Sequence, residues 1–146
     1  MKTLQIMMLV LAITGSVVAQ DMNPDQVPSV ILNSFKKDFP KASDIEWERQ
    51  GNQYQVEFKI GFFSDFEAWY DTSGKLIRYS EDLWKRDLPD AVKATIKRDY
   101  PGYHIDDAKK LVENNTVSYW LEIEKGRQEH KLLLNANGNL ISTPKK

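Results

Sequence analysis

The chain is written as two copies of one sequence pattern. The segment VPSVILNSFKKDFP, which begins at Val27, returns as LPDAVKATIKRDYP at Leu88, and the turn DTSGKLI at Asp71 returns as NANGNLI at Asn135. A repeat of roughly 60 residues corresponds to one supersecondary unit that occurs twice. We therefore expect the same local fold to occur twice.

The N-terminal residues have the features of a secretory signal. Met1 and Lys2 form a basic start, the apolar run 4–13 follows, and the small residues 17–19 precede Gln20. The apolar run is shorter than the roughly 18 residues that a membrane-spanning helix needs. The sequence therefore predicts a signal peptide at residues 1–19 that is removed after export, with no membrane insertion afterwards.

Charge and cysteine content restrict the possible partners and chemistry. The chain has 20 Lys and Arg against 21 Asp and Glu, and the two signs are interleaved along the sequence. Such a balance creates no positive field for phosphates, so no nucleic acid partner is expected. The absence of cysteine excludes disulfide bonds, thiolate chemistry and a lipoprotein anchor.

Each copy opens with a segment whose apolar residues recur at helical spacing. Prolines stand at both ends of the segment in both copies, which is typical of helix boundaries. Apolar residues at this spacing form the buried side of an amphipathic helix. The expected buried stripes are Val27, Val30, Ile31, Phe35 and Phe39 in the first helix, and Leu88, Val92, Ile96 and Tyr100 in the second.

Alternating strands follow each helix, and their turns predict how they pair. A two-residue turn at Gly51-Asn52 would place Trp47 opposite Val56 and Ile45 opposite Phe58. A three-residue tip at 61–63 would place Phe58 opposite Phe66 and Lys59 opposite Asp65. In the second copy, a turn at Gly126-Arg127 would place Tyr119 opposite Leu134, Leu121 opposite Leu132 and Glu122 opposite Lys131.

These patterns predict an α+β fold made of two tandem repeats. Each repeat has one helix followed by four antiparallel strands, and both helices cover one face of a shared sheet. We expect residues 20–146 to form a single domain with repeats at about 24–82 and 83–143. Trp47 and Trp84 are expected in the core and between the repeats.

The chain resembles the PepSY-like periplasmic family, also described as β-lactamase-inhibitor-protein-like. The resemblance lies in the proline-bounded helices, which end in DFP or DYP, and in the hairpins YDTSGKLI and LNANGNLI. This resemblance implies a periplasmic protein of a Gram-negative bacterium with one curved sheet. It also implies that the protein binds or inhibits another protein. The family supplies no catalytic residues that could be transferred to this chain.

No residue pattern predicts an enzyme, a cofactor or a metal centre. The two histidines, His104 and His130, stand in unrelated contexts, whereas metal sites need clustered ligands. His130 is expected to be a structural residue at the inward end of a strand. The turn at Asp71 lacks the alternating oxygen ligands of a calcium loop. Neither a nucleophile motif nor a glycine-rich phosphate loop is present.

Aromatic residues beyond the needs of a core are the remaining signal. The predicted registers place Trp69, Trp120 and Leu133 on the face opposite the helices, and Tyr79 joins them if Tyr70 pairs with Leu76. Phe62 and Phe63 lie at a hairpin tip in the first copy only. Local packing and a recognition surface both account for these residues. The predicted partner-binding residues are Phe62, Phe63, Trp69, Tyr79, Trp120 and Leu133.

The favoured interpretation is a non-enzymatic binding or inhibitory module. Its partner would be an unidentified periplasmic protein or peptide, held by aromatic residues with Glu57, Glu67 and Lys131 beside them. The alternative is a protein that binds a small apolar ligand, a peptide or a glycan on the same face.

Overall fold

The computed structural model describes residues 20–62 and 64–144. The predicted signal peptide and Phe63 lie outside the described residues. A short strand and a 3-10 helix come first, and two similar sets of elements follow. The leading elements are β1 (Gln20–Met22) and η1 (Pro24–Gln26).

Each repeat contains one helix and then four strands, as the sequence predicts. The first repeat contains α1 (Ser29–Asp38), β2 (Ala42–Gln50), β3 (Gln53–Ile60), β4 (Ser64–Asp71) and β5 (Leu76–Asp82). The second, after η2 (Lys85–Asp87), contains α2 (Asp90–Asp99), β6 (His104–Glu113), β7 (Thr116–Lys125), β8 (Gln128–Asn135) and β9 (Leu140–Ser142).

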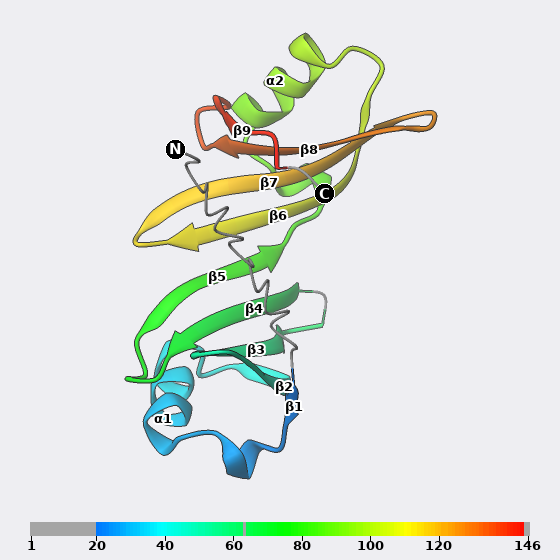
Figure 1. The fold of residues 1–146 in the computed structure, drawn as a ribbon. Helices are drawn as coiled ribbons and strands as arrows, with labels where there is room; N and C mark the ends of the chain where they lie inside the picture. The colour runs from blue at the N-terminus through cyan, green and yellow to red at the C-terminus, as the bar shows by residue number, and fades with distance from the viewer. Residues whose placement is uncertain (1–19, 63, 145–146) are drawn as a thin grey trace, which may run out of the picture.

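All nine strands belong to one antiparallel sheet in sequence order. The two repeats join where β5 pairs with β6, from Arg78 opposite Glu113 to Asp82 opposite Lys109. Figure 1 shows the curved sheet with α1 at one end and α2 at the other. Neither helix among the described residues is long and apolar enough to cross a membrane.

Both helices lie on the same face of the sheet. Side chains directly opposite each other on neighbouring strands point to the same side. Successive strand pairs connect Phe66 to Leu134, so the two side chains point to the same side of the sheet. The residues between them in this series are Glu81, Lys110 and Tyr119. Phe66 packs against the core under α1, and Leu134 is buried in the core under α2.

The buried residues form two clusters, one in each repeat. In the first, Phe35 of α1 packs against Trp47 and Phe58, with ring centroids 5.3 Å and 5.0 Å away. In the second, the buried Val92 and Ile96 belong to a cluster with Leu121, Ile123, Leu132 and Leu134. Val30, expected on the buried stripe of α1, is 46% exposed because it lies at the edge of the helix contact.

The glycine in each repeated turn motif lets a hairpin pack closely under its helix. Gly138 has a φ of +80°, and a β-carbon there would lie 2.4 Å from the Ala91 carbonyl oxygen of α2. Gly74 has a φ of +83°, and its β-carbon would lie 3.0 Å from the Val30 carbonyl oxygen of α1. Asp71 and Asn135 accept hydrogen bonds from backbone N–H groups within these turns.

The registers predicted from the turns are confirmed along most of the sheet. Trp47 lies opposite Val56 and Phe58 lies opposite Phe66. The remaining confirmed pairs are Lys59 with Asp65, Tyr119 with Leu134, Leu121 with Leu132, and Glu122 with Lys131.

Two irregularities overturn expectations that assumed regular pairing. A bulge in β2 leaves Ile45 without the expected partner Phe58, and Ile45 is 41% exposed. A second bulge lies between Trp69 and Tyr70, where Tyr70 pairs with Leu76 but Trp69 pairs with Arg78. This bulge shifts the alternation of β5 by one residue, so Tyr79 lies opposite Ala68 on the core side and contacts Phe39.

Trp84 was also predicted wrongly as a packing residue. It is 58% exposed, whereas the neighbouring Leu83 packs against the second cluster. The chain leaves the sheet at this point and enters η2, which turns Trp84 away from the core. The guanidinium group of Arg86 lies 5.5 Å from the Trp84 ring.

Candidate functional site

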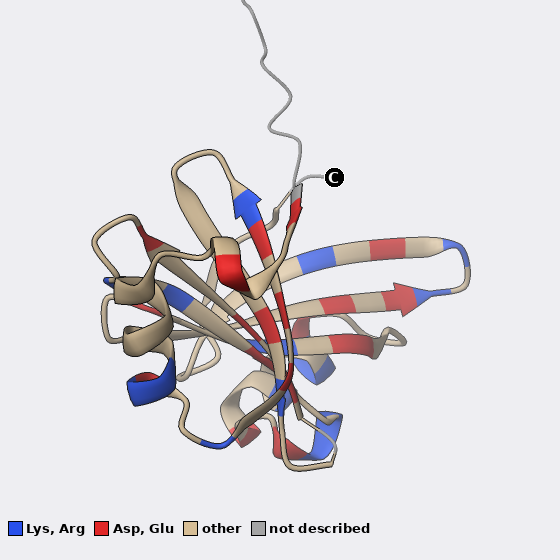
Figure 2. Cartoon of the chain, turned by 90° about the horizontal axis from the view of Figure 1, so that it is seen from below, with Lys and Arg blue, Asp and Glu red and all other residues tan. Residues whose placement is uncertain are grey.

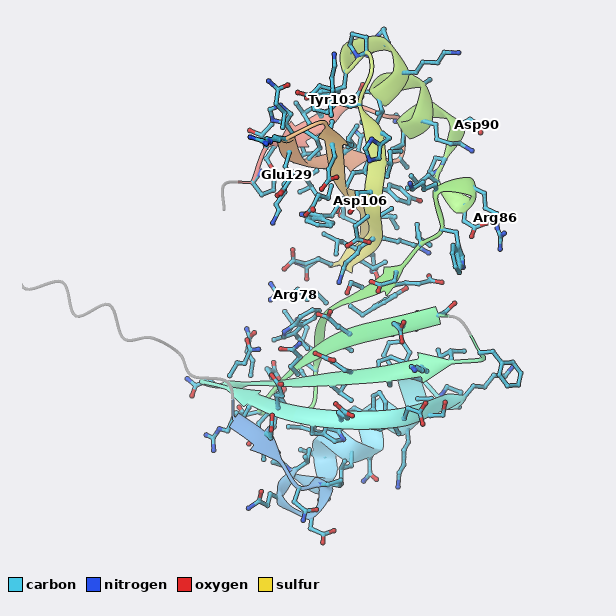
Figure 3. The ribbon with its side chains drawn as sticks, turned by 90° about the vertical axis from the view of Figure 1, so that its right-hand side faces the viewer. Arg78, Arg86, Asp90, Tyr103, Asp106 and Glu129 are labelled. Atoms are coloured by element: carbon cyan, nitrogen blue, oxygen red, sulfur yellow. The ribbon has the colours of Figure 1, made fainter. Side chains whose placement is uncertain are left out.

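The face of the sheet away from α1 and α2, here called the outer face, holds three of the six predicted site residues. Trp120 lies opposite Leu133 on this face, in the second repeat. Trp69 lies on it in the first repeat, opposite Arg78, whose guanidinium group is 4.5 Å from the Trp69 ring. Arg78 stands near the middle of the sheet, where the two repeats meet (Figure 3).

The predicted site residues do not form one continuous patch. Two strands, β5 and β6, separate Trp69 from Trp120. Phe62 is 94% exposed at the β3–β4 tip. An extended chain from Phe62 to Trp69 spans roughly 20 Å, so the two rings are far apart. Tyr79 belongs to the core, and Phe63 lies outside the described residues.

Carboxylates occupy the outer face between Phe62 and Trp69. Glu57 of β3 lies directly opposite Glu46 of β2 on one side and Glu67 of β4 on the other. This set of three, here called the glutamate row, crosses three neighbouring strands. Figure 2 shows how Asp and Glu recur along the strands of the sheet. Side chains in direct opposition lie about 5 Å apart at their β-carbons, so their charges repel one another.

The equivalent row of the second repeat carries a different charge pattern. There Glu122 lies between Asp107 and Lys131, and Lys131 Nζ is 3.7 Å from a carboxylate oxygen of Glu122. The position that Lys131 occupies in the second repeat is held by Glu67 in the first. From the sequence, Glu57 and Glu67 were expected only as charges beside the aromatic residues. The confirmed pairing of Phe58 with Phe66 already implied that these two glutamates face each other.

The electrostatics of the glutamate row are unfavourable at Glu57. Partial desolvation raises the pKa of Glu57 above its ordinary value. The carboxylates of Glu67, Glu48 and Glu46 raise this pKa further, and Lys109 lowers it. Among the described residues, Glu57 forms no ion pair within 4.0 Å.

Lys109 neutralises the neighbouring part of the outer face. Its ammonium group lies 3.3 Å from a carboxylate oxygen of Glu67 and 3.3 Å from one of Asp82. Burial opposes the charge of Lys109, but the two carboxylates outweigh it, so the pKa of Lys109 is raised. Burial also raises the pKa of Asp82, and Lys109 partly offsets this effect.

An open groove of about 630 Å³ is lined by all three residues of the glutamate row. Its walls are mainly polar and negatively charged, with Lys59 as the cation that lines it. Lys59 Nζ is 4.0 Å from Asp44, although Asp65 lies directly opposite Lys59 in the sheet. The lining residues are Asp44, Ile45, Glu46, Glu57, Phe58, Lys59, Asp65, Phe66, Glu67 and Asp82.

Possible metal ligands come together at the far end of the second repeat. His104, Asp106 and Glu124 have ligand atoms within 4.8 Å of one another, as do Glu122, Glu124 and Glu129. Asp106 and Glu129 lie in the half of the molecule that also contains Tyr103 (Figure 3). Lys131 lies 3.7 Å from Glu122 and 3.9 Å from Glu129, so an internal cation already offsets part of this charge. The expected structural His130 is exposed, with its Nε2 atom 3.2 Å from the Tyr103 hydroxyl.

Comparison with known families gives a match over most of the chain. The model of the family described as "Putative beta-lactamase-inhibitor-like, PepSY-like" matches residues 16–78 and 53–142. No curated protein matches the sequence.

Several solved structures have the same fold. A BLIP-like protein from Bacteroides fragilis gives a TM-score of 0.72 at 23% identity, covering 80% of this chain and 84% of that chain. A DUF2874 family protein from Bacteroides uniformis gives 0.73 at 17% identity, covering 80% and 88%. A Bacteroides eggerthii protein described as "putative periplasmic" gives 0.73 at 15% identity, covering 81% and 88%. At these identities the likeness establishes the fold.

Proposed function

Since the chain belongs to the PepSY-like family, described as beta-lactamase-inhibitor-like, we propose that it is a non-enzymatic module that binds a protein partner through the outer face of its sheet. The observation that carries this proposal is the outer face, which no helix among the described residues covers. Both helices pack on the other side, yet Trp69, Trp120 and Leu133 lie on this one. Tryptophan residues on an uncovered surface are typical of interface hot spots.

The shape of the groove favours an extended partner over a small ligand. Small-molecule pockets are mostly apolar and enclose their ligand. The groove lined by the glutamate row is open, and six of its ten lining residues are acidic. Phe62 stands at the end of the same hairpin, where its exposed ring can contact a partner that lies along β3 and β4.

Capture from a periplasmic extract tests this function. The mature protein would be immobilised, and retained proteins would be identified by mass spectrometry. We expect a partner that binds the wild type and is lost from a Phe62→Ser, Trp69→Ser double variant. Val30→Ser is the matched control, because Val30 is an exposed apolar residue on α1, away from the outer face. A folded double variant that retains every wild-type partner would exclude this face. Assaying a captured enzyme with and without the protein tests inhibition.

The same proposal places the protein in the periplasm after removal of residues 1–19. Its support is the basic and apolar N-terminal sequence, together with the small residues before Gln20, which are the features of a signal peptide. The intact mass of the exported protein should correspond to a chain that starts near Gln20. A mass that includes the whole leader would contradict this processing.

A further inference from the structure

The two repeats provide an internal comparison for the glutamate row. Glu57 and Glu122 occupy equivalent positions, on β3 and β7, and each has an acidic neighbour on the preceding strand. The neighbour on the following strand differs, because Glu67 lies opposite Glu57 whereas Lys131 lies opposite Glu122. Like charges directly opposite each other destabilise a sheet. The first repeat therefore keeps an unfavourable pair at a position where the second repeat has a favourable one.

The molecule also shows how a cation is held on the outer face. Lys131 Nζ lies beside Glu122 in the second repeat, at 3.7 Å. Lys109 Nζ lies between Glu67 and Asp82, at 3.3 Å from each. In both cases an ammonium group from another strand lies against carboxylates of the sheet surface. Glu46 and Glu57 lie on the same face of the sheet, but no ion pair within 4.0 Å reaches either of them among the described residues.

We propose that the glutamate row binds a lysine or arginine side chain of an extended segment of the protein partner, whose cationic group lies against Glu57 as the ammonium group of Lys131 lies against Glu122 in the second repeat. Charge complementarity identifies this occupant, because the row and its groove are acidic and open to solvent. Phe62 at the hairpin tip and Trp69 beyond the row can contact apolar residues of the same segment. This inference rests on the proposed function and adds the chemical class of the bound segment.

Binding of a hexalysine peptide, measured by calorimetry at low ionic strength, tests the inference. The variants are Glu57→Gln and Glu122→Gln, which change the net charge equally at equivalent positions of the two repeats. We expect Glu57→Gln to weaken binding by about tenfold, the usual value of one charged hydrogen bond. Glu122→Gln should leave the affinity within about twofold, because it changes only the general attraction between the peptide and the whole protein. Both variants change that attraction equally.

The outcomes separate a specific site from general attraction. Equal loss in both variants, or no binding to the wild type, would overturn the inference. Thermal melts of both variants show whether they fold, and Glu57→Gln is expected to fold because it removes a repulsion.

If hexalysine binding does not depend on Glu57 but the Phe62→Ser, Trp69→Ser variant still loses its partner, the proposed cationic segment is wrong and the proposed function stands. If the aromatic variant keeps its partners while Glu57→Gln loses hexalysine, the proposed aromatic surface is wrong instead.

Discussion

The hydroxyl group of Tyr70 donates a hydrogen bond of 2.9 Å to Asp38 Oδ2 and so connects β4 to the last turn of α1. Tyr70 is fully buried, and burial raises the pKa of its hydroxyl group, with the hydrogen bond to Asp38 adding to the effect. The second repeat has no such contact, because Leu134 occupies the equivalent position and Asp99 pairs with Arg98. The two repeats thus share a backbone but hold their helices differently.

Tyr70→Phe should destabilise the protein by about 1–2 kcal/mol, the cost of losing one hydrogen bond to a charged group whose acceptor stays accessible to water. Tyr54→Phe is the matched control, since Tyr54 is also buried but its hydroxyl makes no hydrogen bond within the described part of the chain. Urea unfolding would measure both. Equal effects would show that the Asp38 contact contributes nothing.

Gly138→Ala should cost about 2–5 kcal/mol, because it combines a left-handed backbone with overpacking against α2. The added β-carbon would lie 2.7 Å from Thr95 Oγ1 as well as 2.4 Å from the Ala91 carbonyl oxygen. Gly126 is the matched control, because it has a similar φ of +62° but no atom within 4 Å of an added β-carbon. Gly126→Ala should therefore cost only about 1–2 kcal/mol, the strain of one left-handed residue. Similar losses at both positions would mean that the turn does not pack on the helix.

Phe35→Ala should cost at least about 3 kcal/mol, as large-to-small changes in a core do. Phe35 is 3% exposed, and the ring centroids of Phe39, Trp47 and Phe58 lie between 5.0 Å and 5.8 Å from its own. The adjacent Lys36 is exposed on α1. Lys36→Ala should therefore change stability by less than about 0.5 kcal/mol, as exposed substitutions do. Denaturation curves that rank the two variants the other way would show that the buried face of α1 is wrongly assigned.

The repeat and its turns were enough to predict the α+β fold, because turn length fixes register and register fixes which side chains share a face. The same reasoning failed wherever a strand carries an extra residue. The bulge before Tyr70 moved Tyr79 into the core, and the bulge in β2 moved Ile45 out of it. No residue type in β5 marks such a bulge in advance. Trp84 shows a related limit, because hydrophobicity alone does not reveal where a chain leaves the sheet.

The candidate site was predictable only in part. Trp69, Trp120 and Leu133 lie on the face that the alternation of their strands predicts. Trp69 is separated from Trp120 and Leu133 by the two strands β5 and β6. This separation depends on how the two repeats join in the sheet. The glutamate row follows from a register that the sequence already predicts, but its meaning comes from comparison with Lys131.

Phe62→Ser should change stability by less than about 1 kcal/mol, since exposed positions contribute little to folding. Phe62 is 94% exposed, and the second repeat has no aromatic residue at its corresponding tip, Gly126-Arg127. Thermal melting of the variant checks this prediction. A large loss would show that the tip folds back onto the sheet and is a packing element.

Glu57→Gln should stabilise the protein by about 0.2–1 kcal/mol at neutral pH, the usual size of a cross-strand charge effect. The pKa of Glu57 is raised in the folded state, so the folded protein holds this proton more tightly than the unfolded chain does. The wild type therefore loses stability as the pH rises from the ordinary carboxyl range through the raised pKa. Besides burial, the groups that set this shift are Glu46 and Glu48 on β2, Glu67 on β4 and Lys109 on β6.

The advantage of Glu57→Gln should accordingly vanish below the ordinary pKa of a glutamate and reach its full size above the raised one. Urea melts of variant and wild type across the acidic range measure this difference. High salt should reduce it by screening the exposed charges. A difference that stays constant with pH would show that the repulsion at Glu57 is not its cause.

The most direct measurement of where a partner segment binds is an NMR titration of the mature protein with the hexalysine peptide, following the side-chain carboxyl carbons. The account predicts the largest shifts at Glu46 and Glu57, with smaller changes at Glu67, which pairs with Lys109, and at Glu122 and Glu129, which pair with Lys131. Shifts of equal size in both repeats, or shifts centred on the second repeat, would contradict a binding surface at the glutamate row.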